Sequence, residues 1–215
     1  MALLGIDCAT TTGLALQAKD GSIRAYSFRP RAKRAFEYEA GKIDFTHRGK
    51  AAMELLEHLQ LLIKDQMELG DPITDVAIEM PLRSNITFTK TEVNPNAGFF
   101  GQAVTKHQKG GTTMAVIYSL YGLHTIACAA FSDVNINVHV VEQNAWRSSF
   151  YRGERPPRGT ADNTKWWKNL AKKYCDMLKI PVPNADAAEA VGILWWLKSQ
   201  LEPKHRAAET LFGES

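Results

Sequence analysis

The sequence predicts a single α/β domain, and three observations lead to this fold class. Short apolar runs typical of buried strands alternate with longer stretches of helical periodicity. Three strand-like runs follow one another at the start of the chain. The length of 215 residues, with 45% apolar and 23% charged residues, suits one domain with a sizeable core. We expect residues 1–202 to form this domain and residues 203–215 to form a C-terminal tail.

The first three strands are predicted at residues 2–7, 14–17 and 23–28. The first is a short apolar run that ends at Asp7. The second and third flank Lys19-Asp20-Gly21-Ser22, and Asp-Gly between two apolar runs is typical of a β-hairpin. We therefore expect the chain to begin with successive antiparallel strands.

Helices and strands alternate in the rest of the chain. Leucines and methionines at helical spacing predict a helix over 46–69, which Gly70-Asp71-Pro72 ends. A strand over 76–80 follows. Residues 82–111, rich in Asn and Gly, are predicted to form a long exposed loop. The further predictions are a helix over 112–131 that is buried on most sides, a strand over 136–142, helices over 143–150, 164–178 and 186–201, and a Pro/Gly/Arg loop over 152–159.

Composition excludes several classes of protein. Three cysteines, odd in number and far apart, exclude a disulfide scaffold and a Cys-rich zinc site. The first residues resemble no signal peptide, so we expect a cytoplasmic protein. The uncharged stretch 112–131 has the length of a membrane span, but its hydroxyl groups and His124 favour a core helix, and we expect no membrane partner.

Charge is unevenly distributed although the net charge is only +3. Residues 54–79 hold seven acids and one base, whereas residues 147–173 hold eight bases and two acids. A second basic stretch, 29–50, holds seven bases and three acids. Such segregation can steer a polyanion toward the basic segments, and the alternative is a pair of solvated faces.

Four acids lie where they could bind a metal ion. Asp7 and Glu79 each end an apolar strand, and Asp186 and Glu189 share one face at the start of the last helix. Converging carboxylates suit Mg²⁺ or Mn²⁺, and two such ions can stabilise the attacking and leaving oxygens of a phosphodiester displacement. Each acid also has a structural interpretation. Asp7 could bond to the following threonine turn, Glu79 could face water, and Asp186 with Glu189 could form a capping box.

Three motifs resemble those of one family. Gly5-Ile6-Asp7-Cys8-Ala9-Thr10-Thr11-Thr12-Gly13, Ala77-Ile78-Glu79 and Asp186-Ala187-Ala188-Glu189-Ala190 resemble the acid-bearing motifs of the RuvC-type Holliday-junction resolvases, in the style of the phage-encoded branch, whose members act in a bacterial host cell. The resemblance implies an RNase H-like fold: a mixed five-stranded sheet, its first three strands antiparallel, with helices on both faces. It also implies a homodimer that nicks opposed strands of a four-way junction and leaves 5′-phosphate and 3′-hydroxyl ends.

The same resemblance implies roles for individual residues. Two Mg²⁺ or Mn²⁺ ions would be held by Asp7, Glu79, Asp186 and Glu189. Lys165 falls where the family has a helix-opening lysine that contacts the scissile phosphate, and Arg147 falls near a second such lysine. The residues expected to bind DNA are Arg147, Arg152, Arg155, Arg158, Lys165 and Lys168. Aromatic residues are interleaved with the basic segments, and we expect Trp146, Tyr151, Trp166 and Trp167 to stack on bases exposed at the crossover. The alternative for Trp166 and Trp167 is that at least one of them packs in the core.

The chain departs from the family pattern at three points. Glu189 stands where the family commonly has Asp, which changes the reach of the ligand by one methylene. Cys8 replaces a proline and is expected to be a small core residue. No aromatic residue directly follows Glu79, although Phe88, Phe99 or Phe100 could serve the base-stacking role.

Other functions stay open at this stage. The same acids would serve an RNase H-like nuclease that acts on flaps, forks or RNA–DNA hybrids. A catalytically inactive junction-binding module could keep the same fold. Asp7 followed by Thr10-Thr11-Thr12-Gly13 also resembles the first phosphate loop of ATP-binding proteins of the actin, Hsp70 and sugar-kinase type, but those proteins need a second lobe for which this chain has no room.

Overall fold

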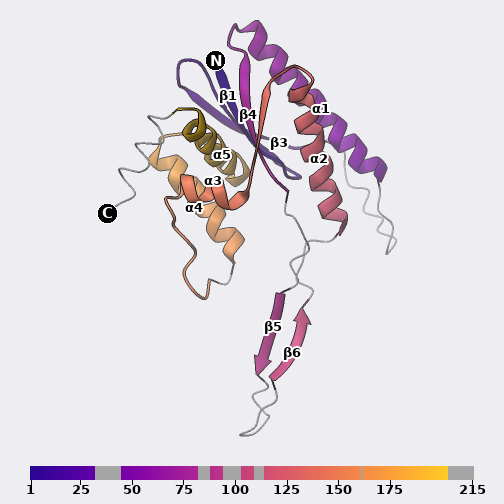
Figure 1. Ribbon diagram of the computed structural model, residues 1–215, viewed down its shortest axis with the longest axis vertical. Coiled ribbons are helices and arrows are strands. Elements are labelled where there is room, and N and C mark those ends of the chain that lie inside the picture. Colours follow the sequence, from indigo (N-terminus) through magenta and orange to yellow (C-terminus); the bar gives the residue numbers. More distant parts are fainter. Residues whose placement is uncertain (32–44, 82–87, 94–102, 109–113, 161, 203–215) are drawn as a thin grey trace.

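A mixed five-stranded sheet forms the centre of the computed structural model, which describes residues 1–31, 45–81, 88–93, 103–108, 114–160 and 162–202. The strand order is β3-β2-β1-β4-β7 (Figure 1). The antiparallel strands are β1 (Ala2–Asp7), β2 (Thr12–Gln17) and β3 (Ile23–Phe28). Strand β4 (Ile73–Glu79) pairs in parallel with β1, and β7 (Asn137–Val141) pairs in parallel with β4. This arrangement confirms the predicted α/β sheet and its three antiparallel strands.

The Asp-Gly turn between β2 and β3 forms as predicted. The Ala18 amide donates to the Ser22 carbonyl and the Gly21 amide donates to the Ala18 carbonyl, both at 2.9 Å. Gly21 has a φ of 86°, in the left-handed region that favours glycine. The carboxylate of Asp20 accepts from the amide and hydroxyl of Ser22, which closes the turn.

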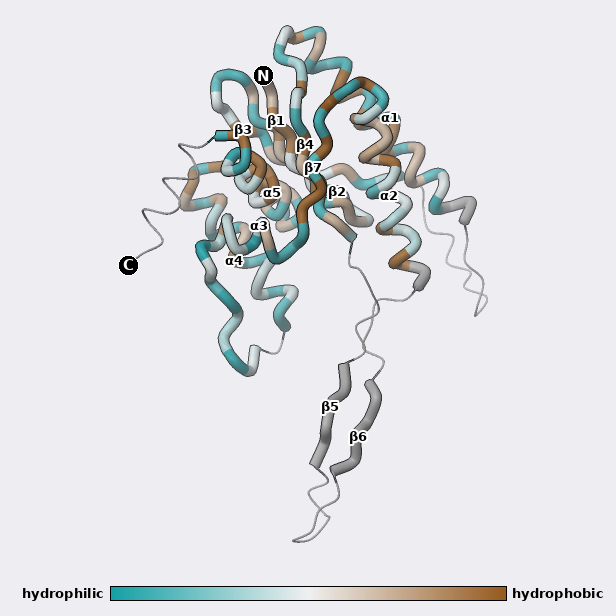
Figure 2. The backbone as a smooth tube through the Cα atoms, in the orientation of Figure 1, coloured by the Kyte–Doolittle hydropathy of each residue, from teal (hydrophilic) through white to brown (hydrophobic). Residues whose placement is uncertain are grey.

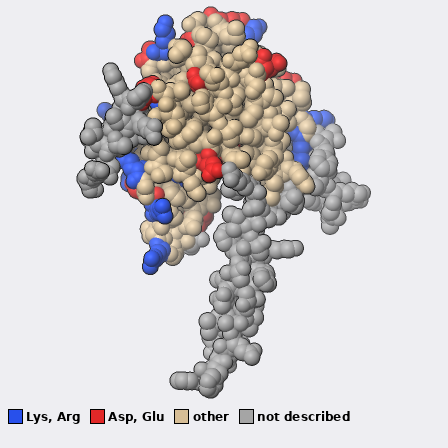
Figure 3. All heavy atoms as spheres, in the orientation of Figure 1, with Lys and Arg blue, Asp and Glu red and all other residues tan. Residues whose placement is uncertain are grey.

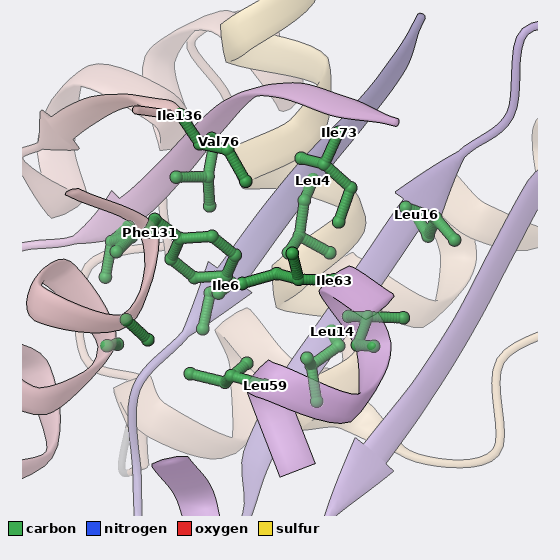
Figure 4. Close-up of a cluster of buried hydrophobic side chains, with 14 of the residues drawn as sticks. Leu4, Ile6, Leu14, Leu16, Leu59, Ile63, Ile73, Val76, Phe131 and Ile136 are labelled. Atoms are coloured by element: carbon green, nitrogen blue, oxygen red, sulfur yellow. The ribbon is translucent and has the colours of Figure 1, made fainter. Parts of the chain in front are cut away.

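Helices cover both faces of the sheet (Figure 1). One face carries α1 (Phe45–Glu68) and α2 (Met114–Ser132), and the other carries α3 (Gln143–Phe150), α4 (Asn163–Met177) and α5 (Ala185–Leu201). Side chains alternate along β1, so Leu4 and Ile6 pack with Leu59 and Phe131 beneath α1 and α2 (Figure 4). Strongly hydrophobic segments of the backbone trace lie in the central strands (Figure 2).

Helix α5 lies directly on β1 because Gly5 has no side chain. A Cβ added to Gly5 would lie 2.5 Å from the Ala190 carbonyl oxygen and from the Leu194 amide nitrogen. Real Cβ atoms do not come so close to backbone, so only glycine allows this approach. The close packing brings the first two turns of α5, which carry Asp186 and Glu189, to the end of β1.

The prediction that residues 82–111 form one long loop is partly wrong, because two strands lie within this range. Phe88–Val93 (β5) and Ala103–Gln108 (β6) pair antiparallel in a ribbon that extends away from the main sheet (Figure 1). Thr and Val recur in both segments, as is typical of strands, but the Asn and Gly residues around them favoured a loop interpretation. The candidate stacking residues Phe99 and Phe100 and the tail 203–215 lie outside the described residues.

Burial of α2 on most sides is also not observed. Leu123, Ala127 and Phe131 are buried, whereas Val116 and Tyr121 are each 37% exposed and Tyr118 is 50% exposed. The helix is apolar all round, but only one side of it packs on α1 and the sheet. No helix in the described part of the chain combines the length and apolarity that a membrane crossing requires.

Candidate metal centre

Three of the four predicted metal ligands converge at one end of the sheet. Asp7 ends β1, and Asp186 and Glu189 lie in the first two turns of α5. One carboxylate oxygen from each residue lies within 4.8 Å of the other two. Asp7 precedes Asp186 by 179 positions in the chain, and the packing of α5 on Gly5 brings Asp7 close to both acids of α5.

The first turn of α5 is capped by Asn184 and not by Asp186. The Asn184 side chain accepts from the Ala187 amide at 2.9 Å and donates to the Ser27 hydroxyl on β3 at 2.7 Å. Asp186 is therefore inside the helix, and the capping-box interpretation is wrong. Sequence analysis missed Asn184, although Asn directly before a helical run is a common cap.

Glu79 ends β4 beside these three acids, and both of its carboxylate oxygens accept hydrogen bonds from side chains of α3. Its Oε1 accepts from Gln143 Nε2 at 2.8 Å, and its Oε2 accepts from the indole N–H of Trp146 at 3.2 Å. Trp146 is fully buried, so Glu79 does not simply face water. Sequence analysis missed both donors. Their three-residue spacing on a helix that follows β7, the strand next to β4, was the available indication.

Burial and mutual repulsion control the electrostatics of the acids. Burial raises the pKa of Asp7 well above its usual value, and the charges of Glu79, Glu189 and Asp186 raise it further. Burial raises the pKa of Glu79 to about 7 and also raises the pKa of Glu189. Such a cluster is costly to keep ionised unless a cation neutralises it. An all-oxygen, mutually repelling donor set fits a hard divalent cation such as Mg²⁺ or Mn²⁺.

Two cations in the described part of the chain reach these carboxylates. Arg147 Nη2 lies 3.3 Å from Glu189 Oε1, and Lys168 Nζ donates to Asp186 Oδ1 at 2.8 Å. The hydrogen bond to Asp186 raises the pKa of Lys168. Lys165 instead lies exposed in the first turn of α4, where its amide donates to the capping Asp162 side chain. The structure thus brings Lys168 to the acids and leaves Lys165 on the surface.

The remaining basic residues predicted to bind DNA are exposed. Arg152, Arg155 and Arg158 lie in the loop before α4. Lys and Arg side chains gather over this region, at the lower left of the molecule in Figure 3. The surface is therefore accessible to a polyanion.

The predicted base-stacking aromatic residues are largely internal. Trp146 and Tyr151 are both 0% exposed, so the prediction that they stack on bases is wrong. Both belong to an aromatic cluster with Phe150 and Tyr174 under α3 and α4. Trp166 and Trp167 are half-buried and pack against the same core.

Similarity to known proteins is found in the structure and not in the sequence. No protein-family model and no curated protein matches the sequence. A solved structure of Thermus thermophilus RuvC in complex with a Holliday junction substrate is similar, with a TM-score of 0.51 and 10% identity over 94% of this chain and 97% of that chain. The chain has a RuvC-type fold.

A second structure, of Thermus thermophilus RuvC, has a TM-score of 0.45 and 13% identity over 94% of this chain and 96% of that chain. The strand order and the similarity to the junction-bound RuvC structure confirm the mixed five-stranded fold expected from the three motifs. Assignment to the phage-encoded branch stays a prediction. On this fold, the acids of β1, β4 and α5 meet at one end of the sheet.

Proposed function

We propose that this protein is a divalent-metal-dependent endonuclease that resolves four-way DNA junctions by paired nicks, leaving 5′-phosphate and 3′-hydroxyl ends. The observation that carries the proposal is the convergence of Asp7, Asp186 and Glu189 within 4.8 Å on a RuvC-type fold. The similar structure of RuvC holds a Holliday junction substrate, which supports branched DNA as the substrate here.

The carboxylates and the nearby lysine have different proposed roles. Asp7, Asp186 and Glu189 would hold Mg²⁺ or Mn²⁺, which when bound supplies Lewis acidity for water activation and neutralises phosphate charge. Glu79, whose oxygens accept hydrogen bonds from Gln143 and Trp146, lies beside these acids and would be a further ligand for the second ion that the family resemblance implies. Lys168 lies at the rim of the cluster with its side chain 42% exposed, where it can stabilise charge on a phosphate.

DNA would bind through the exposed basic residues around α4. Arg152, Arg155, Arg158 and Lys165 offer contacts to backbone phosphates, which give affinity without sequence readout. Binding through such contacts weakens steeply as salt concentration rises.

Two opposed nicks require two active sites, so the proposal includes a homodimer. The exposed apolar residues of α2, Val116, Tyr118 and Tyr121, support contact with a second copy of the chain. Light scattering at micromolar concentration should give twice the chain mass. A strictly monomeric protein that still makes paired nicks would contradict this part of the proposal.

The proposed function is tested with labelled four-way junctions, duplexes, flaps and RNA–DNA hybrids, each with and without Mg²⁺. We expect paired nicks in the junction alone, only with Mg²⁺. Asp7→Asn should abolish nicking and leave junction binding within about threefold of the wild-type value, because one neutralised ligand prevents metal binding but leaves the basic surface intact. Asp133→Asn, at the exposed end of α2, is the matched control.

Other outcomes would replace the proposal. Cleavage of flaps or hybrids in preference to junctions would indicate a different RNase H-like nuclease. Junction binding by the wild-type protein with no cleavage under any divalent ion would indicate a non-catalytic module. Stoichiometric ATP binding would favour the phosphate-loop interpretation of residues 7–13.

A further inference from the structure

Residues 152–160 lie between α3 and α4 and carry three exposed arginines, and we call this segment the arginine loop. It begins with a tight turn. Arg152 and Gly153 have φ angles of 49° and 78°, and the Glu154 amide donates to the Tyr151 carbonyl at 2.9 Å. A left-handed φ is unfavourable for arginine, so this turn needs support from its surroundings.

Tyr174 on α4 gives the turn this support. Its hydroxyl lies 2.7 Å from Glu154 Oε1 and 3.2 Å from the Tyr151 carbonyl oxygen. Tyr174 is 9% exposed, and its ring packs against those of Phe150 and Tyr151. Burial raises the pKa of Tyr174 to about 12, and the hydrogen bond to Glu154 acts in the same direction, so the hydroxyl keeps its proton near neutral pH. One buried donor therefore ties the start of the arginine loop to the core.

The far end of the arginine loop is closed by local hydrogen bonds. The amide and the hydroxyl of Thr160 both donate to the Pro157 carbonyl, at 3.2 and 2.7 Å. Gly159 has a φ of 85°, which glycine adopts without strain. Two consecutive prolines, Pro156 and Pro157, restrict the backbone between the two ends. The backbone that carries the arginines is thus ordered in the DNA-free protein.

Glu154 is the one acid in the sequence of this loop, between Arg152 and Arg155. On a surface that binds DNA, an exposed carboxylate is unfavourable because it repels phosphates. Its hydrogen bond to Tyr174 gives this acid a structural role that offsets the repulsion. A loop that is ordered before binding loses less conformational entropy on binding, so its affinity for the ligand is higher.

We propose that Tyr174 and Glu154 are positioning residues for DNA binding, which hold the arginine loop in the conformation that presents its arginines to backbone phosphates. Neither residue contacts DNA in this role. The inference rests on the proposed function as a junction nuclease. It adds the residues that make this part of the basic surface rigid.

Fluorescence anisotropy with a labelled four-way junction, at several NaCl concentrations and without Mg²⁺, measures the effect on binding. Tyr174→Phe should weaken binding about three- to tenfold, because a hydrogen bond is lost and the loop must become ordered during binding. The slope of log affinity against log salt concentration should stay the same, since the same phosphates are contacted. Arg155→Gln, which removes a phosphate contact, should lower the magnitude of this slope by about 1.

The matched control is Tyr26→Phe. It removes a hydroxyl that lies 3.3 Å from His58 Nε2 on the other face of the sheet. Junction affinity and its salt dependence should not change in this variant.

Two substitutions of Glu154 should have effects of opposite sign. Glu154→Ala removes the acceptor of the Tyr174 hydroxyl and should weaken junction binding, although the protein becomes more positively charged. Glu154→Gln keeps an oxygen acceptor and removes the charge, so it should bind at least as tightly as the wild-type protein. Glu57→Ala, which removes an exposed acid from α1, should leave the affinity unchanged.

Limited proteolysis with trypsin in the absence of DNA measures the order of the loop directly. Cleavage after Arg152 and Arg158, identified by mass spectrometry, should be about threefold or more faster in Tyr174→Phe and in Glu154→Ala than in the wild-type protein. Circular dichroism checks that each variant is folded. If Tyr174→Phe does not fold, Glu154→Ala, at an exposed position, still tests the inference.

Two results would overturn the inference. One is tighter junction binding by Glu154→Ala than by the wild-type protein, because a solvated acid that only repels DNA would behave in this way. The other is wild-type affinity with an unchanged cleavage rate in a folded Tyr174→Phe variant. A wild-type protein that binds no junction would refute the proposed function, and the cleavage rates would still show whether Tyr174 orders the loop.

Discussion

The backbone carbonyl of Asp186 lies directly against Gly13. A Cβ on Gly13 would overlap this carbonyl oxygen, and Gly13 is the residue that pairs with Asp7 in the β1–β2 ladder. The contact therefore sets how closely the first turn of α5 approaches the end of β1. Through it, one glycine in β2 determines the separation of Asp7 and Asp186, two of the proposed metal ligands.

Replacing Gly13 by Ala should disrupt the metal centre and the fold together. We expect the free energy of unfolding to fall by about 1–3 kcal/mol, because backbone must move to admit the methyl group. Mn²⁺ affinity should fall by a factor of about ten or more, because a loss of about 1.4 kcal/mol in binding free energy corresponds to tenfold weaker binding. Denaturant titration and calorimetry measure the two effects.

The control for this substitution is Gly49→Ala in α1, where a Cβ would meet open space. This change should stabilise the helix by up to about 1 kcal/mol and leave Mn²⁺ binding unchanged. Equal stability and metal affinity for Gly13→Ala and the wild-type protein would show that α5 can shift without consequence.

The stability of the metal-free protein should depend on Glu79 in a defined direction. Its pKa is raised from 4.5 to about 7 in the folded state, mainly by burial, so the folded protein binds the proton more tightly than the unfolded chain. This contribution is fully present below pH 4.5 and is lost as the pH rises toward 7. We expect a loss of about 1–3 kcal/mol over this interval.

Urea unfolding of the wild-type protein and Glu79→Gln across this pH range isolates the contribution. The difference between the two curves should grow as the pH rises, because Gln carries no titrating proton. Saturating Mg²⁺ should reduce the difference by neutralising the cluster. A constant offset between the two proteins at all pH values would contradict the expected titration.

Lys168 and Lys165 should have different effects on the reaction. Lys168→Met removes the cation that donates to Asp186, and it should lower the nicking rate by about 10²-fold with little change in junction affinity. Lys165→Met should mainly weaken binding, because Lys165 is exposed at the start of α4. Single-turnover nicking and fluorescence anisotropy separate rate from affinity. The opposite pattern would return the catalytic role to Lys165.

The β5–β6 ribbon should add phosphate contacts to the junction complex. The ladder pairs Lys90 with Lys106, so the two strands carry basic residues at the same register position. DNA phosphates would neutralise both. A protein variant with both Lys90→Gln and Lys106→Gln should bind junctions more weakly, and the slope of log affinity against log salt concentration should fall in magnitude by about 2.

Anisotropy titrations at several NaCl concentrations measure this slope. Lys64→Gln on α1 is the control, with an unchanged slope expected. An unchanged slope in the double variant would show that the ribbon lysines do not contact DNA.

Several features of the fold were predictable because they depend on local pattern. Asp20-Gly21 specifies its own turn, and apolar runs that end at Asp7 and Glu79 specify strands. The β5–β6 ribbon was not predictable in this way, since its pairing joins segments separated by a stretch rich in Asn and Gly. The exposure of Tyr118 was missed because hydropathy reports how apolar a helix is and not how many neighbours cover it.

The sequence by itself determined where the candidate ligands stand: the acids lie at the ends of two strands and at the start of the last helix, and strand and helix periodicity is a local property. Only the tertiary structure decided how these groups are paired. It turns Glu79 toward Gln143 and Trp146, brings Lys168 to Asp186, and encloses Arg147 between two tryptophans. These contacts depend on the approach of α3, α4 and α5 to the sheet, which is set by packing between residues far apart in the chain.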